Sequence, residues 1–303
     1  MNEPLVSIVM NCFNGETFLK RALESVIKQT YSNWELIFWD NLSTDKSKNI
    51  FLSINDNRLK YFSSEKFKIL YVARNDALTK CNGKYITFLD TDDYWYAEKL
   101  MSQVQLLEKN ENIGLVYTNY LIENTNKLFL KRKKINSEIF KSGIITKFII
   151  KNYYIALLTV MIRKSFMKGN LQNFDSKYNM LSDFDYILRF SKVYEIDFIR
   201  DIMAVYNQHQ NQLQIRNIYA QAKQYNEWFE DKIIKNKVFG EDHDFSYLKK
   251  RKVFLNFIKD AENKDFFTKI KDLFFYQNNL DKVKLFFLLF LPRKIFEKIF
   301  SLT

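Results

Sequence analysis

Glycine is scarce in this sequence, and its scarcity excludes several common nucleotide sites. Only six of the 303 residues are glycine, at positions 15, 83, 114, 143, 169 and 240. Neither the G-x-G-x-x-G fingerprint of dinucleotide-binding enzymes nor the G-x-x-x-x-G-K-[ST] loop of P-loop enzymes can be built from them. A G-x-S-x-G nucleophile elbow is missing as well. We therefore expect neither a dinucleotide-dependent Rossmann enzyme nor a P-loop nucleotidase.

Cysteine and long apolar runs are also scarce. The two cysteines, Cys12 and Cys81, have neither the spacing of metal ligands nor that of a disulfide framework, which fits a reducing compartment. No stretch of about 18 apolar residues occurs, so we expect no transmembrane helix. Met1–Pro4 lacks the basic and apolar regions of a signal peptide. These features predict a cytoplasmic protein.

Positive charge exceeds negative charge, which indicates an anionic partner. The net charge is +12 at pH 7, which suits a nucleic acid, an acidic lipid or a phosphorylated substrate. Residues 211–303 hold 18 Lys or Arg and 12 Asp or Glu, and so carry half of the excess. Hydrophobic residues at 47% and aromatic residues at 17% are enough for a sizeable core. The length suits one large domain, or one domain with an appendage.

The last residues combine positive charge with a short apolar run. Residues 282–303 contain five Lys or Arg and one Glu, and Leu285–Leu291 is a run of seven apolar residues. Such a run cannot cross a bilayer, but flanking cations can hold it in the membrane interface. It can equally form a helix packed on the protein, and both interpretations stay open. A second basic run, Lys131–Lys134, is interpreted as a solvated loop, with contact to an anionic acceptor as the alternative.

Strand and helix patterns alternate over the first 120 residues. Strands are expected at 5–10, 34–39, 59–62 and 85–89, and helices at 18–28, 45–52, 71–80 and 97–109, with Ser43 or Thr44 as a helix cap. This alternation predicts an α/β fold with a mostly parallel sheet. Further strands are expected at 115–122 and 158–163, and only helices beyond about residue 211.

Three acidic residues follow the expected strand at 85–89. Asp90, Asp92 and Asp93 fall where this strand ends, and ligands of open α/β sheets bind beyond such ends. A cation relieves the repulsion among the three carboxylates, and oxygen ligands suit Mg²⁺ or Mn²⁺. Such ions commonly clamp a diphosphate. Taken alone, the segment fits equally well a solvated turn whose acids cap the next helix.

Polar residues follow the first two strands as well. The first strand runs into Asn11–Asn14, and the second ends at Asp40 and Asn41. Because the carboxyl ends of parallel strands meet at one edge of a sheet, a ligand can contact all three ends. The three aligned ends favour the metal site over the solvated turn.

The order and spacing of these motifs resemble the opening of the family 2 glycosyltransferases, which have the GT-A fold. The resemblance rests on residues 4–15 (PLVSIVMNCFNG), 23–31 (LESVIKQTY), 39–45 (WDNLSTD), 73–75 (ARN) and 83–93 (GKYITFLDTDD). It is dense to residue 110, patchy to about 210 and absent beyond. It implies a GT-A nucleotide-diphospho-sugar transferase domain over residues 1–210. A helical, basic C-terminal region over residues 211–303 follows, with membrane association as one role.

The resemblance implies roles for residues that hold the sugar donor. Phe13 falls where the family places an aromatic ring against the base, and Asn11 where a hydroxyl residue often contacts the nucleoside. Asp40 and Asn41 fall where the family usually has two aspartates, of which the second reads the base edge. An amide both donates and accepts, so the identity of the base stays open. Arg74 is implied to neutralise phosphate, with a surface arginine as the alternative.

The resemblance also implies a metal site. Asp90 and Asp92 match the D-x-D element that holds the divalent ion, Mn²⁺ or Mg²⁺, on the donor diphosphate, and Asp90 is also placed near the nucleotide. His209 ends a Tyr-x-x-His element whose histidine can complete the metal site in this family. An exposed histidine is the alternative for His209.

A general base is implied further along the chain. Asp183 falls at the position of the family's catalytic aspartate, and Ser182 replaces the glutamate that usually precedes it. Asp185 is the competing base, although Arg189 stands four residues on as a partner for it. An N-cap role for Ser182 or Asp183 is compatible with catalysis.

Together these features predict an inverting, metal-dependent glycosyltransferase of the hexosyl or N-acetylhexosaminyl class, with Asp183 as general base. UDP is the favoured nucleotide of the donor. The expected acceptor is a glycan, free or linked to polyprenyl diphosphate, in surface polysaccharide or lipopolysaccharide assembly. An anionic membrane surface is a further partner, at the cytoplasmic face of the inner membrane.

Three other classes of protein were weighed against this prediction. A sugar-phosphate nucleotidyltransferase has a related core, but its glycine-rich loop does not fit residues 11–16, where Gly15 is the only glycine. A nucleic-acid-binding protein accounts for the charge but not for three acids at a strand end, so no nucleic acid is expected. A non-catalytic sugar-nucleotide binder accounts for the departures from the family pattern at Asn41 and Ser182.

Overall fold

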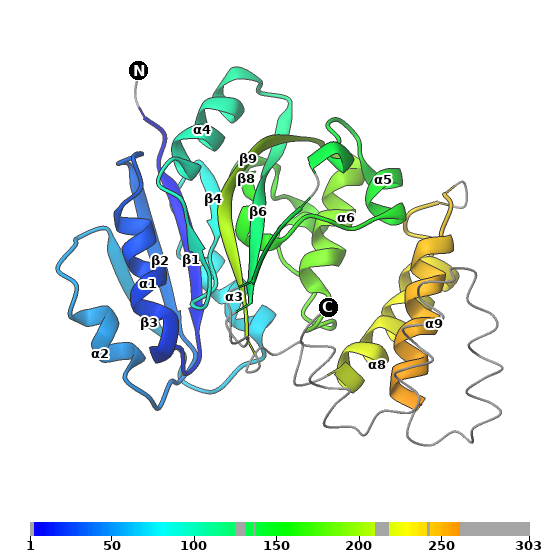
Figure 1. The fold of residues 1–303 in the computed structure, drawn as a ribbon, viewed down its shortest axis with the longest axis horizontal. Coiled ribbons are helices and arrows are strands. Elements are labelled where there is room, and N and C mark those ends of the chain that lie inside the picture. The colour runs from blue at the N-terminus through cyan, green and yellow to red at the C-terminus, as the bar shows by residue number, and fades with distance from the viewer. Residues whose placement is uncertain (1–2, 125–130, 136, 210–217, 241–242, 261–303) are drawn as a thin grey trace. The chain divides into compact units, whose positions relative to one another are not determined.

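The chain divides into two compact units, of which residues 1–149 and 153–207 form the first and residues 150–152 and 208–303 the second. The computed structural model describes residues 3–124, 131–135, 137–209, 218–240 and 243–260 (Figure 1). A functional boundary at residue 210 stays a prediction.

A mixed sheet organises the first unit. In the described ranges it has nine strands in the order β3-β2-β1-β4-β8-β6-β9-β5, with β7 paired to β6. The strands are β1 Val6–Cys12, β2 Trp34–Asp40, β3 Leu59–Ser63, β4 Tyr85–Phe88, β5 Tyr94–Trp95, β6 Ile113–Asn124, β7 Lys131–Lys134, β8 Met161–Arg163 and β9 Glu195–Gln208. The helices are α1 Glu16–Ile27, α2 Ser47–Leu52, α3 Leu70–Leu78, α4 Lys99–Lys109, α5 Thr146–Lys151 and α6 Ser182–Val193. Short 3₁₀ turns are η1 Ser137–Ile139, η2 Leu157–Thr159, η3 Lys164–Phe166 and η4 Gly169–Leu171.

The strands β3, β2, β1 and β4 are parallel to one another. β1, β2 and β4 are buried along their whole length, as expected of a parallel sheet covered on both faces. The helix α1 buries Leu19, Leu23 and Val26 in the core that it shares with β1. The α/β prediction is confirmed, and the expected strands and helices up to residue 109 are present to within two residues at most ends.

The chain reverses its direction along the sheet at β1. From β1 it moves outward to β2 and β3, and then returns to β4 on the other side of β1. Right-handed crossovers that run in opposite directions lie on opposite faces of a sheet, so α1 and α3 cover different faces. Ligands of doubly wound sheets bind at the carboxyl ends of the strands where this reversal occurs. Here those ends are the segments that follow β1 and β4.

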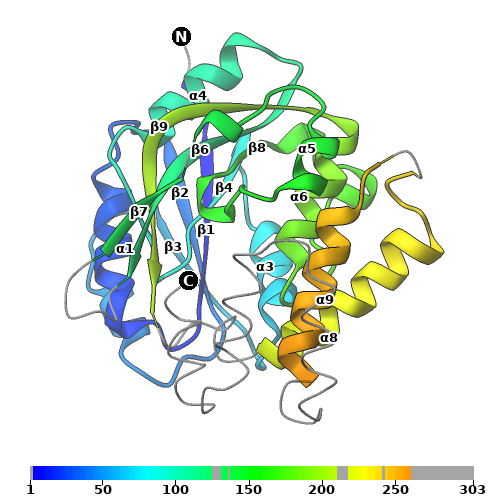
Figure 2. The ribbon, with the colours of Figure 1, turned by 45° about the vertical axis from the view of Figure 1, so that its right-hand side comes forward.

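Several local expectations were wrong. Neither Ser43 nor Thr44 caps α2, which begins at Ser47 without a side-chain cap; instead the Asp45 carboxylate accepts a hydrogen bond from the Ser47 amide at 2.9 Å. The basic run Lys131–Lys134 is the strand β7, paired antiparallel with the end of β6, and not a loop (Figure 2). Charged residues are typical of a strand at the edge of a sheet.

The second unit is helical in its described part. It contains α8 Ile218–Trp228, the π-helix η5 Phe229–Lys235 and α9 Ser246–Asp260. α8 and α9 pack side by side, and the Tyr225 hydroxyl donates a hydrogen bond to the carbonyl of Leu248 at 3.2 Å (Figures 1 and 2). The basic and apolar segment at 282–303 lies outside the described residues. Among the described helices, none has the length and apolar character needed to cross a membrane.

Candidate active site

The acidic turn after β4 is held by an arginine of α3. The Arg74 guanidinium donates to the Asp90 carboxylate at 2.5 Å. Arg74 is only 2% exposed, whereas 43% of the Asp90 side chain reaches solvent. Burial works against the charge of Arg74, yet the carboxylates of Asp90 and Asp183 raise its pKa above the ordinary value. The interpretation of Arg74 as a surface arginine was therefore wrong.

The rest of the turn is anchored by its backbone and by Asp93. Arg21 of α1 donates to the carbonyl of Asp92 at 3.3 Å, and the amide of Asn207 donates to the Asp93 carboxylate at 2.8 Å. Asp93 is buried, and burial together with the charges of Asp92 and Asp90 raises its pKa well above the ordinary value. It does not cap the following helix, because α4 begins only at Lys99. The alternative in which the acids of this turn cap the next helix was therefore wrong for Asp93.

The loop after β1 touches the acidic turn directly. A Cβ atom on Gly15 would lie 2.9 Å from Oγ1 and 3.2 Å from Cβ of Thr91, the residue between the two metal-ligand candidates. These distances are shorter than ordinary van der Waals contact, so only glycine fits at position 15 without displacing Thr91. This close approach accounts for a glycine in a chain that has few.

Asp183 lies in the same electrostatic environment although it is distant in sequence. It stands in the first turn of α6, and its carboxylate accepts a hydrogen bond from the amide of Phe184 at 2.8 Å. Burial raises the pKa of Asp183 above the ordinary value, while the Phe184 amide, the charge of Arg74 and a hydrogen bond from Tyr71 partly offset that rise. Partial burial and the charges of Asp92 and Asp183 likewise raise the pKa of Asp90, and Arg74 opposes this effect. The fold therefore brings Asp90, Arg74 and Asp183 together.

An asparagine next to Arg74 fixes the segment that leads to Asp183. The Asn75 amide donates to the carbonyl of Phe174 and accepts from its amide, both at 2.9 Å. The ring of Phe174 packs against Tyr71 and Tyr186, at centroid distances of 5.2 and 4.7 Å. Adjacent residues of α3 thus hold the acidic turn and the segment that leads to Asp183. Asn75 was not among the predicted site residues, although it stands in the A-R-N motif at 73–75.

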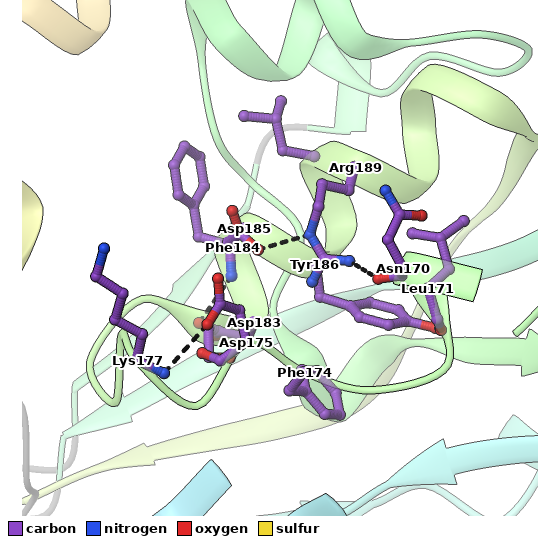
Figure 3. A network of polar contacts seen from close by, with 12 residues as sticks. Asn170, Leu171, Phe174, Asp175, Lys177, Asp183, Phe184, Asp185, Tyr186 and Arg189 are labelled. Carbon is purple, nitrogen blue, oxygen red and sulfur yellow. Dashed lines mark hydrogen bonds and ion pairs between the residues drawn. The ribbon is translucent and has the colours of Figure 1, made fainter. Parts of the chain in front are cut away.

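The competing base, Asp185, is occupied by a structural contact. Its side chain is fully buried and pairs with Arg189 at 2.7 Å (Figure 3). Arg189 also donates to the carbonyl of Asn170. The alternative of an N-cap role for Ser182 or Asp183 was wrong, because α6 has Leu181 as its N-cap and no side-chain cap. Ser182 instead donates to the carbonyl of Asp175 at 2.8 Å.

The polar residues after β2 are engaged within the protein. The two carboxylate oxygens of buried Asp40 accept from the Ser43 amide at 2.8 Å and the Tyr61 hydroxyl at 2.7 Å. The amide of Asn41 bonds to both backbone groups of Lys68. Both residues therefore shape the sheet edge, and no contact with a base edge is needed to account for them.

The residues at the carboxyl end of β1 and just beyond it are of a different kind. The Asn11 side chain is 7% exposed, and neither polar atom of its amide has a hydrogen-bond partner among the described residues. Leaving a buried amide unpaired is costly, so Asn11 is suited to pairing with a ligand. The ring of Phe13 is 52% exposed at the same end of β1, where a base can stack on it.

The carboxylates of the acidic turn fit a cation that is shared with phosphates. In the described part of the chain, no group of three or more His, Cys, Asp or Glu side chains is arranged to hold a metal ion alone. Mg²⁺ is usually bound through one or two carboxylates, the rest of its shell coming from water and substrate phosphates. Asp90 and Asp92 supply that number. His209 belongs to the second unit, and its role as a metal ligand stays a prediction.

Solved structures share this fold. TarS of S. aureus in complex with UDP-GlcNAc aligns with a TM-score of 0.62 over 92% of this chain and 81% of that one, at 16% identity. The mannosyltransferase PcManGT from Pyrobaculum calidifontis, in complex with GDP-Man and Mn²⁺, aligns with a TM-score of 0.60 over 100% of this chain and 88% of that one, at 14% identity. At such identities the likeness concerns the fold, which is that of the GT-A transferases.

The profile of Glycosyl transferase family 2 matches residues 7–169, more than half of the chain, and the chain belongs to this family. The family resemblance and the fold class are thus confirmed. The E. coli UDP-Glc:alpha-D-GlcNAc-diphosphoundecaprenol beta-1,3-glucosyltransferase WfgD is 36% identical over 167 residues, 55% of this chain and 63% of that protein. The E. coli enzyme WfaP, which bears the same activity name, is 39% identical over 119 residues, 39% of this chain and 47% of that protein. The chain thus spans about half to two thirds of these relatives.

Proposed function

We propose that this protein is an inverting glycosyltransferase that moves a hexosyl or N-acetylhexosaminyl group from a UDP-sugar to a lipid-linked glycan. One observation carries the proposal. Arg74 pairs with Asp90 at 2.5 Å, and Asp183, from a third and distant segment, lies close enough to both for its charge to shift their pKa values. Such a cluster at the reversal point of the sheet combines a place for a diphosphate with a carboxylate able to accept a proton.

The donor side is assigned to the acidic turn. Asp92 and Asp90 are the proposed ligands of Mn²⁺ or Mg²⁺, and the bound ion neutralises the charge of the departing diphosphate. Arg74 keeps its own positive charge near this diphosphate because two carboxylates stabilise it. The Mn²⁺ in the PcManGT structure supports a divalent ion in this fold.

The acceptor side is assigned to Asp183. Its carboxylate takes the proton of the acceptor hydroxyl while the acceptor oxygen bonds to the anomeric carbon of the sugar. The bond from that carbon to the diphosphate breaks on the opposite face, and the diphosphate leaves with the bonding electrons. Attack from the face opposite the leaving group inverts the configuration at the anomeric carbon.

The names of the relatives support the substrates. WfgD and WfaP are named for transfer from UDP-Glc to GlcNAc-diphosphoundecaprenol, and TarS was crystallised with UDP and with UDP-GlcNAc. A polyprenyl-diphosphate acceptor requires work at a membrane surface. We therefore place the protein peripherally at the cytoplasmic face of the inner membrane, in surface polysaccharide or lipopolysaccharide assembly.

The test compares Asp183→Asn with Asp175→Asn, which removes a carboxylate from the preceding loop. Transfer from UDP-Glc and UDP-GlcNAc to GlcNAc-diphosphoundecaprenol is measured with Mn²⁺ and again with EDTA. A general base contributes about 10²–10⁴-fold, so Asp183→Asn is expected to lose that factor in kcat while it still binds UDP. Asp175→Asn is expected to keep wild-type turnover, and EDTA to abolish it.

The outcomes separate the classes of function. Wild-type protein that binds UDP but never transfers sugar indicates a non-catalytic binder. Near-normal kcat in Asp183→Asn excludes that residue as the base. If UDP, GDP and dTDP-sugars neither bind nor turn over, the glycosyltransferase proposal fails.

A further inference from the structure

Two phenylalanine rings lie open to solvent at the edge of the sheet where the donor is proposed to bind. Phe13 follows β1 and is 52% exposed, and Phe67 follows β3 and is 58% exposed. Their centroids are 4.9 Å apart, with ring planes inclined at 65°. Exposing two adjacent rings forgoes the benefit of burying them, unless a ligand covers them. Because the two planes are inclined, a flat ligand that stacks on one ring meets the other ring at its edge, and both arrangements are favourable for aromatic groups.

The loop that carries Phe67 is held by Asn41. Its side-chain amide donates to the carbonyl of Lys68 at 2.7 Å, and its oxygen accepts from the amide of Lys68 at 3.1 Å. The same oxygen accepts from the Ser64 hydroxyl at 3.2 Å. One buried side chain therefore holds both backbone groups of Lys68, the residue that follows Phe67.

These bonds leave Asn41 little capacity to read a base. An amide oxygen has two lone pairs and an amide nitrogen two hydrogens, and three of these four are in use. An aspartate at position 41 would still accept from the Lys68 amide, but it has no hydrogen to donate to the Lys68 carbonyl. An asparagine therefore holds this loop by one more hydrogen bond than an aspartate would.

We propose that Phe13 and Phe67 form one angled aromatic platform for the nucleobase, which stacks on one ring and meets the edge of the other, and that Asn41 is a positioning residue which presents Phe67 to it. This inference rests on the proposed function, since it takes the donor to be a nucleotide sugar. It replaces the expectation that Asn41 itself reads the base edge. Stacking on a ring is tolerant of base identity, so the platform supplies affinity more than selectivity.

The experiment is calorimetric titration of the full chain with UDP in the presence of Mn²⁺. Removing a stacked ring typically weakens base binding by about tenfold or more, so Phe67→Ala is expected to raise the Kd of UDP by that factor. Donor KM is expected to rise similarly, with kcat within twofold of wild type. Tyr96→Ala removes another exposed ring and serves as the matched control, with unchanged affinity.

Asn41→Asp gives the decisive comparison. If residue 41 reads the base, the aspartate usual in the family should bind UDP at least as tightly as wild type. If it positions Phe67, Asn41→Asp should bind more weakly. In a Phe67→Ala background the same change should then have little further effect, because residues that act through one another are not additive.

The results distinguish this inference from the proposed function. Wild-type affinity in Phe67→Ala, equal or tighter binding in Asn41→Asp, or full additivity of the two changes would each overturn the platform while leaving the transferase proposal intact. Failure of the wild-type protein to bind UDP at all would overturn both. Thermal unfolding of each variant confirms that the compared proteins are folded.

Discussion

The contact between Asn75 and Phe174 permits a quantitative prediction. Asn75→Ala removes two hydrogen bonds of 2.9 Å to the Phe174 backbone. A typical protein hydrogen bond contributes about 0.5–1.5 kcal/mol net, so the pair stabilises the fold by about 1–3 kcal/mol. A loss in catalysis of similar size should accompany the loss in stability, because Phe174 begins the segment that leads to Asp183. A misplacement of about 1 Å in a reacting group can cost about 10²-fold.

The assay is steady-state kinetics with varied donor and acceptor. We expect kcat of Asn75→Ala to fall by about 10²-fold, while donor affinity stays near wild type because the rings of Phe13 and Phe67 are untouched. Asn75→Asp keeps the acceptor for the Phe174 amide but loses the donor to its carbonyl. Its kcat should therefore lie between those of wild type and Asn75→Ala. Asn49→Ala, an exposed asparagine of α2, is the control and should behave as wild type.

Two results would refute this reasoning. If Asn75→Ala loses stability but keeps wild-type kcat, the contact is structural and does not position the base. If donor Kd and kcat deteriorate by the same factor, Asn75 supports the donor site and not the acceptor side.

Two further predictions concern Gly15 and Lys99. Gly15 has an ordinary φ of −98°, so Gly15→Ala should act only by displacing Thr91. We expect the Mn²⁺ concentration for half-maximal rate to rise several-fold. An unchanged metal dependence would contradict this packing argument. Lys99 is fully buried, with Thr87 and Gln103 as its hydrogen-bond partners, and burial lowers its pKa well below the ordinary value. Between that lowered pKa and the unfolded value of about 10.4 the unfolded chain binds the extra proton, so folding stability should rise with pH by up to about 1.4 kcal/mol per unit. In urea unfolding at neutral and alkaline pH, Lys99→Met should lack this rise, and parallel curves for the two proteins would show that Lys99 is not responsible.

Much of the parallel half of the sheet was predictable because its signals are local. β1 and β2 are nearly continuous apolar segments, and α1 has a clear apolar face. β7 was missed because four consecutive cations carry no strand signal of their own, and its partner is the end of β6. β5 is two residues long and exists only through its pairing with β9. Such elements depend on partners that are distant in the chain.

In the candidate site, too, the roles of single residues depend on partners that are distant in the chain. Asp183 and Asp185 are two positions apart in the sequence, and the family resemblance favoured Asp183 while Asp185 stayed a competitor. The helix turns Asp185 into the interior, where Arg189 takes it, and leaves Asp183 beside Tyr71 and Arg74. Asn41 was interpreted as a residue that reads a base. Its bonds to Lys68 became apparent only with the loop in place.

The sequence by itself determined the family, the parallel strands and the acidic turn of Asp90 and Asp92, because each is written in a short continuous segment. Only the tertiary structure decided which side chains act together. Arg74 meets Asp90 across a helix and a strand, Asn75 holds Phe174 from far along the chain, and Phe67 reaches Phe13 through a loop closed by Asn41. Such contacts depend on which side chains are buried and on where they point in the folded chain, and neither can be read from the order of residues.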